Sequence, residues 1–130
     1  QGLSLGATDY LVKKGIEEHQ IERFDVSGAI EIPLIIKKLS KKPRYQGIIA
    51  LGCIIKGDTA HFDYVCKFVT EGILKVSLEQ ELPISFGVLT TNTLEQAQNR
   101  SKFPSQDNKG VESAYALIKQ IQLIREIESN

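Results

Sequence analysis

A short polar turn, Gly57-Asp58-Thr59-Ala60-His61, joins an apolar segment to a helical pattern. Backbone N–H groups in such a turn, together with the positive end of the helix dipole, favour a phosphate or an oxyanion, and the Thr59 hydroxyl adds a donor. Because histidine changes its charge near neutral pH, His61 can carry protons beside an anion held there. Taken alone, such a turn is more often an ordinary helix cap, and a histidine at a helix start is more often structural or exposed.

Two other segments carry residues suited to a ligand. In Val26-Ser27-Gly28-Ala29-Ile30-Glu31, Gly28 lets a ligand approach the backbone and Glu31 can accept hydrogen bonds from hydroxyl groups. The turn expected at Phe86-Gly87-Val88-Leu89-Thr90-Thr91 offers an aromatic face beside a flexible glycine. Ligands of open parallel sheets bind at the carboxyl ends of the strands, where all three turns are expected to meet. Together they suit a polyhydroxylated, partly flat, phosphate-bearing set of substrates.

These turns separate apolar segments from helical patterns. The apolar segments predict strands at 21–26, 45–55 and 82–90, and the helical patterns predict helices at 3–14, 31–40, 62–80, 93–100 and 109–128. The second and third strands are continuously apolar, which is typical of a parallel sheet covered on both faces. The alternation predicts an α/β layered fold with right-handed crossovers. Thr93 to Gln96 has the form of a capping box at a helix start.

Length and composition limit the class of protein. The 130 residues fit one domain, 1–130. Sixteen basic and sixteen acidic side chains cancel, so neither nucleic acid nor a membrane is expected as a partner. No apolar run approaches the ~18 residues that span a bilayer, and Cys53 and Cys66 are expected to be reduced thiols, so we predict a soluble, cytoplasmic protein. The chain begins at Gln1 and has no methionine, so we expect an amino-terminal piece upstream of this numbering.

Five blocks of sequence, in order and spread over nearly the whole chain, resemble the lumazine synthase family of riboflavin biosynthesis. The blocks are Gly28-Ala29-Ile30-Glu31-Ile32-Pro33, Ile55-Lys56-Gly57-Asp58-Thr59-Ala60-His61-Phe62-Asp63-Tyr64, Phe86-Gly87-Val88-Leu89-Thr90-Thr91, Glu95-Gln96-Ala97 with Arg100, and Asn108-Lys109-Gly110. The resemblance implies a three-layer, flavodoxin-like fold whose first central strand would precede this numbering. It also implies a homopentamer, alone or within a decamer or a larger shell, with each active site between two subunits.

The implied reaction condenses 5-amino-6-(D-ribitylamino)uracil with 3,4-dihydroxy-2-butanone 4-phosphate to give 6,7-dimethyl-8-ribityllumazine, phosphate and water. The steps are amine addition to a ketone, dehydration, phosphate elimination and ring closure. Each step moves protons near neutral pH, so a histidine suits the work and neither a metal nor a redox cofactor is expected.

The resemblance also assigns roles to individual residues. His61 matches the proton donor and acceptor. Asp58 and Thr59, with Gly57 beside them, match the part that holds the butanone phosphate, and Arg100 matches its cationic clamp. Lys109 matches a position near the phosphate. The expected contacts to the pyrimidine and its ribityl chain are Ala29, Ile30, Glu31, Cys53, Ile54 and Ile55, with Phe86 supplied across a subunit boundary.

The chain departs from the family pattern in three places. The aromatic residue that stacks on the pyrimidine would fall before Gln1, Ile30 replaces a residue that is usually aromatic, and the loop 101–108 lacks the family's glycines and is longer. Two other functions therefore stay open. One is a module of the same fold that binds a flavin or a phospho-ligand without turnover, and the other is a shell-forming protein without catalysis.

Overall fold

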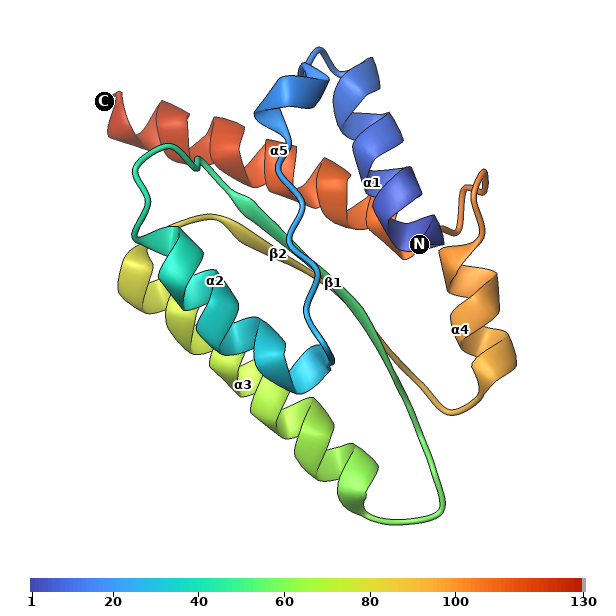
Figure 1. Ribbon diagram of the computed structural model, residues 1–130. Coiled ribbons are helices and arrows are strands. Elements are labelled where there is room, and N and C mark those ends of the chain that lie inside the picture. The colour runs from blue at the N-terminus through green and yellow to red at the C-terminus, as the bar shows by residue number, and fades with distance from the viewer. Residues whose placement is uncertain (130) are drawn as a thin grey trace.

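The computed structural model describes residues 1–129 and has five α-helices and two strands in that part of the chain (Figure 1). The elements are α1 (Gly2–Lys13), the 3₁₀ turns η1 (Glu18–Gln20) and η2 (Ala29–Glu31), α2 (Ile32–Ser40), β1 (Ile48–Ile55), α3 (His61–Gln80), β2 (Ile84–Thr91), α4 (Leu94–Ser101) and α5 (Lys109–Glu128). All five predicted helices are confirmed, and so are the strands predicted at 45–55 and 82–90. No helix within residues 1–129 is long and apolar enough to cross a membrane.

The strand predicted at 21–26 is wrong. This segment forms neither helix nor strand, and most of its side chains are exposed, including that of Phe24. A strand needs a neighbour that satisfies its backbone N–H and C=O groups, and in the described part of the chain the sheet contains only β1 and β2. The apolar pattern of 21–26 therefore predicted a strand, but the described part of the structure contains no neighbouring strand to pair with it.

β1 and β2 run parallel, in a register that pairs Ile48 with Ile84 and Ile55 with Thr91. Parallel neighbours need a crossover connection, and α3 provides it. The first and last residues of the two strands are paired, so the strands end together. The turn after β1 and the loop after β2 therefore leave the same edge of the sheet (Figure 1). This arrangement confirms the α/β class with a parallel sheet.

Helices cover both faces of the sheet, so the fold has three layers of the flavodoxin-like kind (Figure 1). Helices α2 and α3 cover one face, where the main core lies, and α1 and α5 lie on the other. The core combines apolar side chains from α2, α3 and both strands, as predicted for continuously apolar strands. Its buried members are Ile32, Ile36, Ala50, Ile54, Val69, Ile73, Val76 and Val88.

One close approach between elements fixes how α2 and α3 pack. At Gly72 on α3, a Cβ atom would lie 2.8 Å from the ring of Pro33 in the first turn of α2. The absent side chain at Gly72 therefore lets the two helices touch. The predicted capping box also starts α4, because the Gln96 N–H donates to the Thr93 hydroxyl at 3.1 Å and Gln96 Oε1 accepts from the Thr93 N–H.

Candidate functional site

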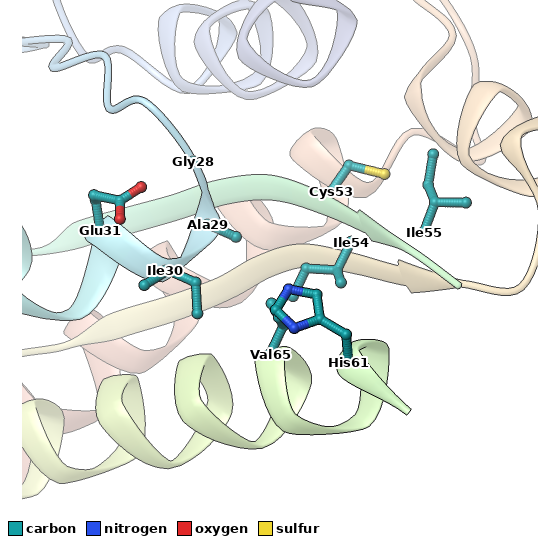
Figure 2. A pocket seen from close by; sticks show the side chains of 9 residues that line it. All are labelled: Gly28, Ala29, Ile30, Glu31, Cys53, Ile54, Ile55, His61 and Val65. Carbon is teal, nitrogen blue, oxygen red and sulfur yellow. The ribbon is translucent and has the colours of Figure 1, made fainter. Parts of the chain in front are cut away.

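A hollow of about 420 Å³ lies at the carboxyl end of β1, between η2 and the start of α3 (Figure 2). Three elements, η2, β1 and α3, supply its walls. The lining residues are Gly28, Ala29, Ile30, Glu31, Cys53, Ile54, Ile55, His61 and Val65. The structure therefore brings together seven of the thirteen predicted site residues, including the histidine and both segments expected to contact a pyrimidine.

His61 owes its place to the start of α3. The residue opens the helix, directly after the exposed turn 57–60, and its side chain stays accessible. Figure 2 shows the imidazole reaching toward the end of β1, near Ile54 and Val65. Because His61 and Val65 are one helical turn apart, they lie on the same face of α3. An accessible imidazole above an apolar wall is suited to passing protons to a ligand held against that wall.

Most of the wall is apolar, and its few polar groups have definite partners. Ile30, Ile54 and Val65 offer flat contact area, while Glu31 carries the carboxylate of this site. The Ser27 hydroxyl donates a hydrogen bond to Glu31 Oε1 at 3.1 Å, which orients that carboxylate. Partial burial raises the pKa of the Cys53 thiol, so its neutral form is favoured at this wall.

The turn before His61 keeps its backbone donors available. The Lys56 N–H is bound to the Thr91 carbonyl at 2.9 Å, but within residues 1–129 the N–H groups of residues 57–60 have no protein acceptor. The Thr59 hydroxyl oxygen accepts from the His61 N–H at 3.3 Å, so its own O–H stays free to donate. Gly57, Asp58 and Thr59 do not line the hollow itself; they lie beside it, at the end of α3 that carries the positive dipole.

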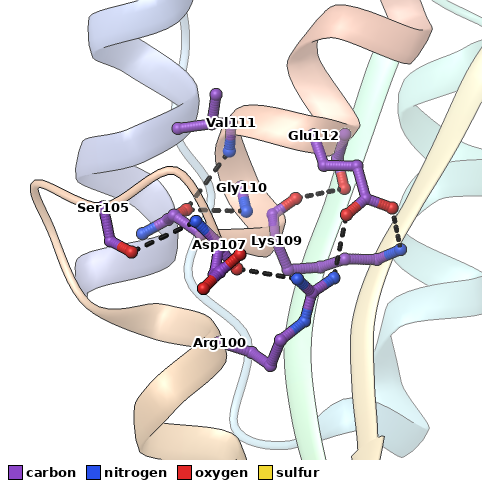
Figure 3. Close-up of polar contacts among 9 residues, drawn as sticks. Arg100, Ser105, Asp107, Lys109, Gly110, Val111 and Glu112 are labelled. Atoms are coloured by element: carbon purple, nitrogen blue, oxygen red, sulfur yellow. Dashed lines mark hydrogen bonds and ion pairs between the residues drawn. The ribbon is translucent and has the colours of Figure 1, made fainter.

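Arg100 and Lys109 lie outside the hollow, where α4 and α5 meet (Figure 3). Arg100 donates from Nη1 to the Asp107 carbonyl at 2.9 Å and from Nη2 to Glu112 Oε2 at 2.8 Å. Lys109 Nζ lies 2.9 Å from the other oxygen of the same carboxylate. Hydrogen bonds from Arg100, and then from Lys109, hold the pKa of the Glu112 carboxyl below its ordinary value. One carboxylate thus joins both cations predicted near the phosphate.

Asn108 also stabilises the junction of α4 and α5. Its side chain is fully buried; Oδ1 accepts from the N–H groups of Gly110 and Val111, and Nδ2 donates to the carbonyls of Gly2 and Lys102. Helix α1 packs so closely here that a Cβ atom at Gly110 would collide with the Leu3 carbonyl. One amide therefore caps α5, closes the loop 102–108 and ties both to α1.

Sequence reasoning missed Glu112 and the full role of Asn108. Both had a signal in the sequence: Glu112 stands three residues after Lys109 on one helix, and an asparagine directly before a helix is a favoured cap. The predicted placement of Phe86 in a turn is wrong. Phe86 lies in the middle of β2 opposite Ala50 and packs against the core, because the strand continues to Thr91. Its contact with a substrate across a subunit boundary stays a prediction.

The fold and the hollow together define a class: an α/β protein with a hollow at the carboxyl edge of a parallel sheet, where such folds bind ligands, lined by an apolar wall and a histidine beside a turn whose backbone N–H groups are free within residues 1–129. The profile of the 6,7-dimethyl-8-ribityllumazine synthase family matches residues 1–125. The 6,7-dimethyl-8-ribityllumazine synthase of Lactiplantibacillus plantarum is 50% identical over 127 residues, which are 98% of this chain and 79% of that relative. The chain belongs to the 6,7-dimethyl-8-ribityllumazine synthase family.

Proposed function

We propose that this protein is a lumazine synthase, a transferase that condenses 5-amino-6-(D-ribitylamino)uracil with 3,4-dihydroxy-2-butanone 4-phosphate. The products are 6,7-dimethyl-8-ribityllumazine, inorganic phosphate and two molecules of water. Family membership supports this activity. The observation that carries it is the meeting of His61 with η2 and the end of β1 around one hollow.

The wall of the hollow suits the pyrimidine substrate. Its flat ring packs on the apolar side chains of Ile30 and Ile54, and the ribityl hydroxyls donate to Glu31, whose carboxylate Ser27 holds in place. The amine then adds to the ketone carbon of the second substrate. His61 takes and returns the protons as the carbinolamine loses water, phosphate leaves and the ring closes. We propose no redox cofactor, because no step transfers electrons to an acceptor, and no metal, because each step is a proton movement near neutral pH that suits a histidine.

The turn 57–60 is the proposed site for the phosphate group. Its unpaired backbone N–H groups and the Thr59 hydroxyl can surround phosphate oxygens close to His61. A second source of positive charge is the pair Arg100 and Lys109, which does not line the hollow of its own protomer. We therefore propose that a neighbouring subunit supplies this pair, together with Phe86, so that each active site lies between two copies.

An exposed apolar stripe on α3 supports assembly. Tyr64, Phe68, Leu74 and Leu78 fall on one side of this helix and are exposed, with Tyr64 reaching 72%. Large apolar side chains exposed on one helix face, here with Lys67, Glu71 and Lys75 between them, favour a contact with another protein. We propose a pentamer of this chain, alone or within a larger shell, and a reducing, cytoplasmic setting that suits its two free cysteines.

The test is to mix both substrates with the protein at neutral pH and follow the absorbance and fluorescence of the lumazine. His61→Gln is the matched control, because it keeps a polar side chain without the proton exchange. We expect turnover by the wild-type protein and a large loss in the variant. Binding of both substrates without any product would instead identify a binding module. Light scattering that shows only a 14.5 kDa species at working concentration would contradict the shared site.

A further inference from the structure

We propose that Glu112 is a positioning residue that holds Arg100 and Lys109 as one two-cation clamp for the phosphate group. This inference rests on the proposed function and deepens it, because neither the family match nor the sequence patterns assign a role to Glu112. The carboxylate bridges the two cations: Oε2 binds Arg100 and Oε1 binds Lys109, each within 2.9 Å (Figure 3). One short side chain thereby sets the distance and direction of two long, flexible ones.

The clamp keeps donors free for an anion. A guanidinium has five N–H groups, and Arg100 uses two of them, on Asp107 and Glu112, which leaves three. The Lys109 ammonium has three and uses one on Glu112. Two cations against one carboxylate leave a net positive charge, and a planar guanidinium fork matches two phosphate oxygens. Glu112 thus uses one donor of each cation, and most of their N–H groups have no protein acceptor within residues 1–129.

The platform under the clamp is rigid. Asn108 is fully buried and binds the backbone on both sides of the loop 102–108, so the end of α4 that carries Arg100 is fixed relative to the start of α5. Because Asn108 Oδ1 already accepts from the N–H groups of Gly110 and Val111, these donors are not available to a ligand. The positive charge at this junction therefore comes from the two side chains that Glu112 orients.

Helix stability accounts for only part of the arrangement: Glu112 lies in the first turn of α5, where the helix dipole favours a carboxylate, but the dipole does not explain Lys109. Lys109 is the first residue of α5, where the helix dipole disfavours a cation. The side chains of Arg100, Glu112 and Lys109 are 37%, 54% and 24% exposed, and ion pairs that solvent screens in this way add little to stability. A cation in an unfavourable position, held by a carboxylate that contributes little to folding, indicates a binding role for the pair.

The proposal makes a prediction opposite in sign to simple electrostatics. Glu112 carries a negative charge beside the proposed dianion site, so Coulomb's law alone predicts that Glu112→Gln binds phosphate more tightly. If Glu112 positions the clamp, the same variant binds phosphate more weakly, because Arg100 and Lys109 lose the partner that aligns them. The sign of the change therefore separates the two explanations.

The experiment titrates inorganic phosphate into the assembled wild-type protein, Glu112→Gln and Glu112→Asp, with calorimetry as the readout. Glu126→Gln is the matched control, since it removes the same charge from an exposed position farther along α5. We expect Glu112→Gln to raise the phosphate Kd and the KM for the butanone phosphate about 3- to 10-fold, the size of a solvent-screened ion pair, with the KM for the pyrimidine unchanged. Glu112→Asp should recover part of the affinity, and Glu126→Gln should match the wild type.

Equal or tighter phosphate binding by a folded Glu112→Gln protein would overturn the clamp, and so would a wild-type protein that binds no phosphate. Circular dichroism and light scattering verify that each variant folds and assembles. Because phosphate binding is measured without turnover, the experiment tests the clamp independently of the proposed reaction. A wild-type protein that makes no lumazine but binds phosphate in a Glu112-dependent way refutes the reaction and keeps the clamp.

Discussion

The guanidinium of Arg100 and the carboxylate of Glu112 lie 2.8 Å apart, across the junction of α4 and α5. Arg100 is also bound to the Asp107 carbonyl, so two anchors fix its fork before any ligand arrives. A side chain held in advance loses less conformational entropy when it binds an anion. Contacts within its own protomer thus hold Arg100 in place, although the hollow of that protomer does not include it.

Arg100→Ala is expected to raise the KM for the butanone phosphate roughly 10- to 100-fold, the cost of a lost charge-assisted pair of hydrogen bonds. The KM for the pyrimidine should change little. Arg100→Lys keeps the charge but loses the planar guanidinium, so its KM for the butanone phosphate should lie between those of the wild type and Arg100→Ala. Steady-state kinetics with each substrate varied in turn provide the measurement. Equal effects on both KM values would refute the assignment to phosphate.

His61→Ala is expected to lower turnover roughly 10- to 1000-fold, the range for the loss of a general acid or base. The fold should survive, because the side chain is accessible and only its backbone N–H binds Thr59. Single-turnover formation of the lumazine, with circular dichroism as the check on folding, measures both effects. An unchanged rate would remove His61 from the catalytic role.

The helices and the two paired strands could be predicted because their patterns are local. The capping residues Thr93 and Gln96 and the continuously apolar strand from Ile48 to Ile55 each determine their own element. Segment 21–26 failed because strand pairing depends on a neighbour that the local pattern does not describe. For Phe86 two expectations conflicted, since the strand predicted at 82–90 already contained the residue, and the structure agrees with the strand and not with the turn.

The candidate site divides in the same way. The resemblance named Ala29, Glu31 and His61, and the structure places all three around one hollow. The ion pairs of Glu112 depend on how α4 meets α5, a tertiary relation that spacing along one helix only hints at. Contacts between subunits depend on surfaces of two copies, and a single sequence describes only one of them.

Asn108→Ala is expected to lower the free energy of unfolding by roughly 2–4 kcal/mol, because it removes a helix cap and leaves two partly buried carbonyls without their donor. The affected groups are the N–H of Gly110 and Val111 and the carbonyls of Gly2 and Lys102. Urea unfolding at a fixed protein concentration measures the loss. Asn99→Ala, at an exposed position on α4, is the control and should change stability by less than about 0.5 kcal/mol.

Gly72→Ala should destabilise the contact between α2 and α3. The added methyl group would lie 2.8 Å from two carbons of the Pro33 ring, which cannot rotate away. Overpacking costs roughly 1–3 kcal/mol and exceeds the gain of up to about 1 kcal/mol from better helix propensity. Urea unfolding distinguishes the two effects, with exposed Glu71→Ala as the control. A more stable Gly72→Ala protein would show that the helices can move apart freely.

Acid should weaken the contribution of Glu112 to stability. Arg100, and then Lys109, lower the pKa of this carboxyl from its ordinary 4.5, so the stabilisation is present above that value and is lost as the pH falls through the lowered pKa. Near neutral pH the free energy of unfolding of the wild type should exceed that of Glu112→Gln by less than about 1 kcal/mol, since the ion pairs of Glu112 are screened by solvent. That difference should vanish in strong acid. Urea unfolding of both proteins across this pH range tests the sign.

The buried amide of Asn108 ties α1 to the junction of α4 and α5 through the Gly2 carbonyl. We therefore expect motions of α1 and of the junction of α4 and α5 to be linked. A phosphate bound by Arg100 and Lys109 is expected to slow amide hydrogen exchange in α1, although no atom of that helix would touch it. In the reverse direction, mutations that loosen α1 should speed the release of phosphate, so residues with no chemical role could set the rate at which the product leaves.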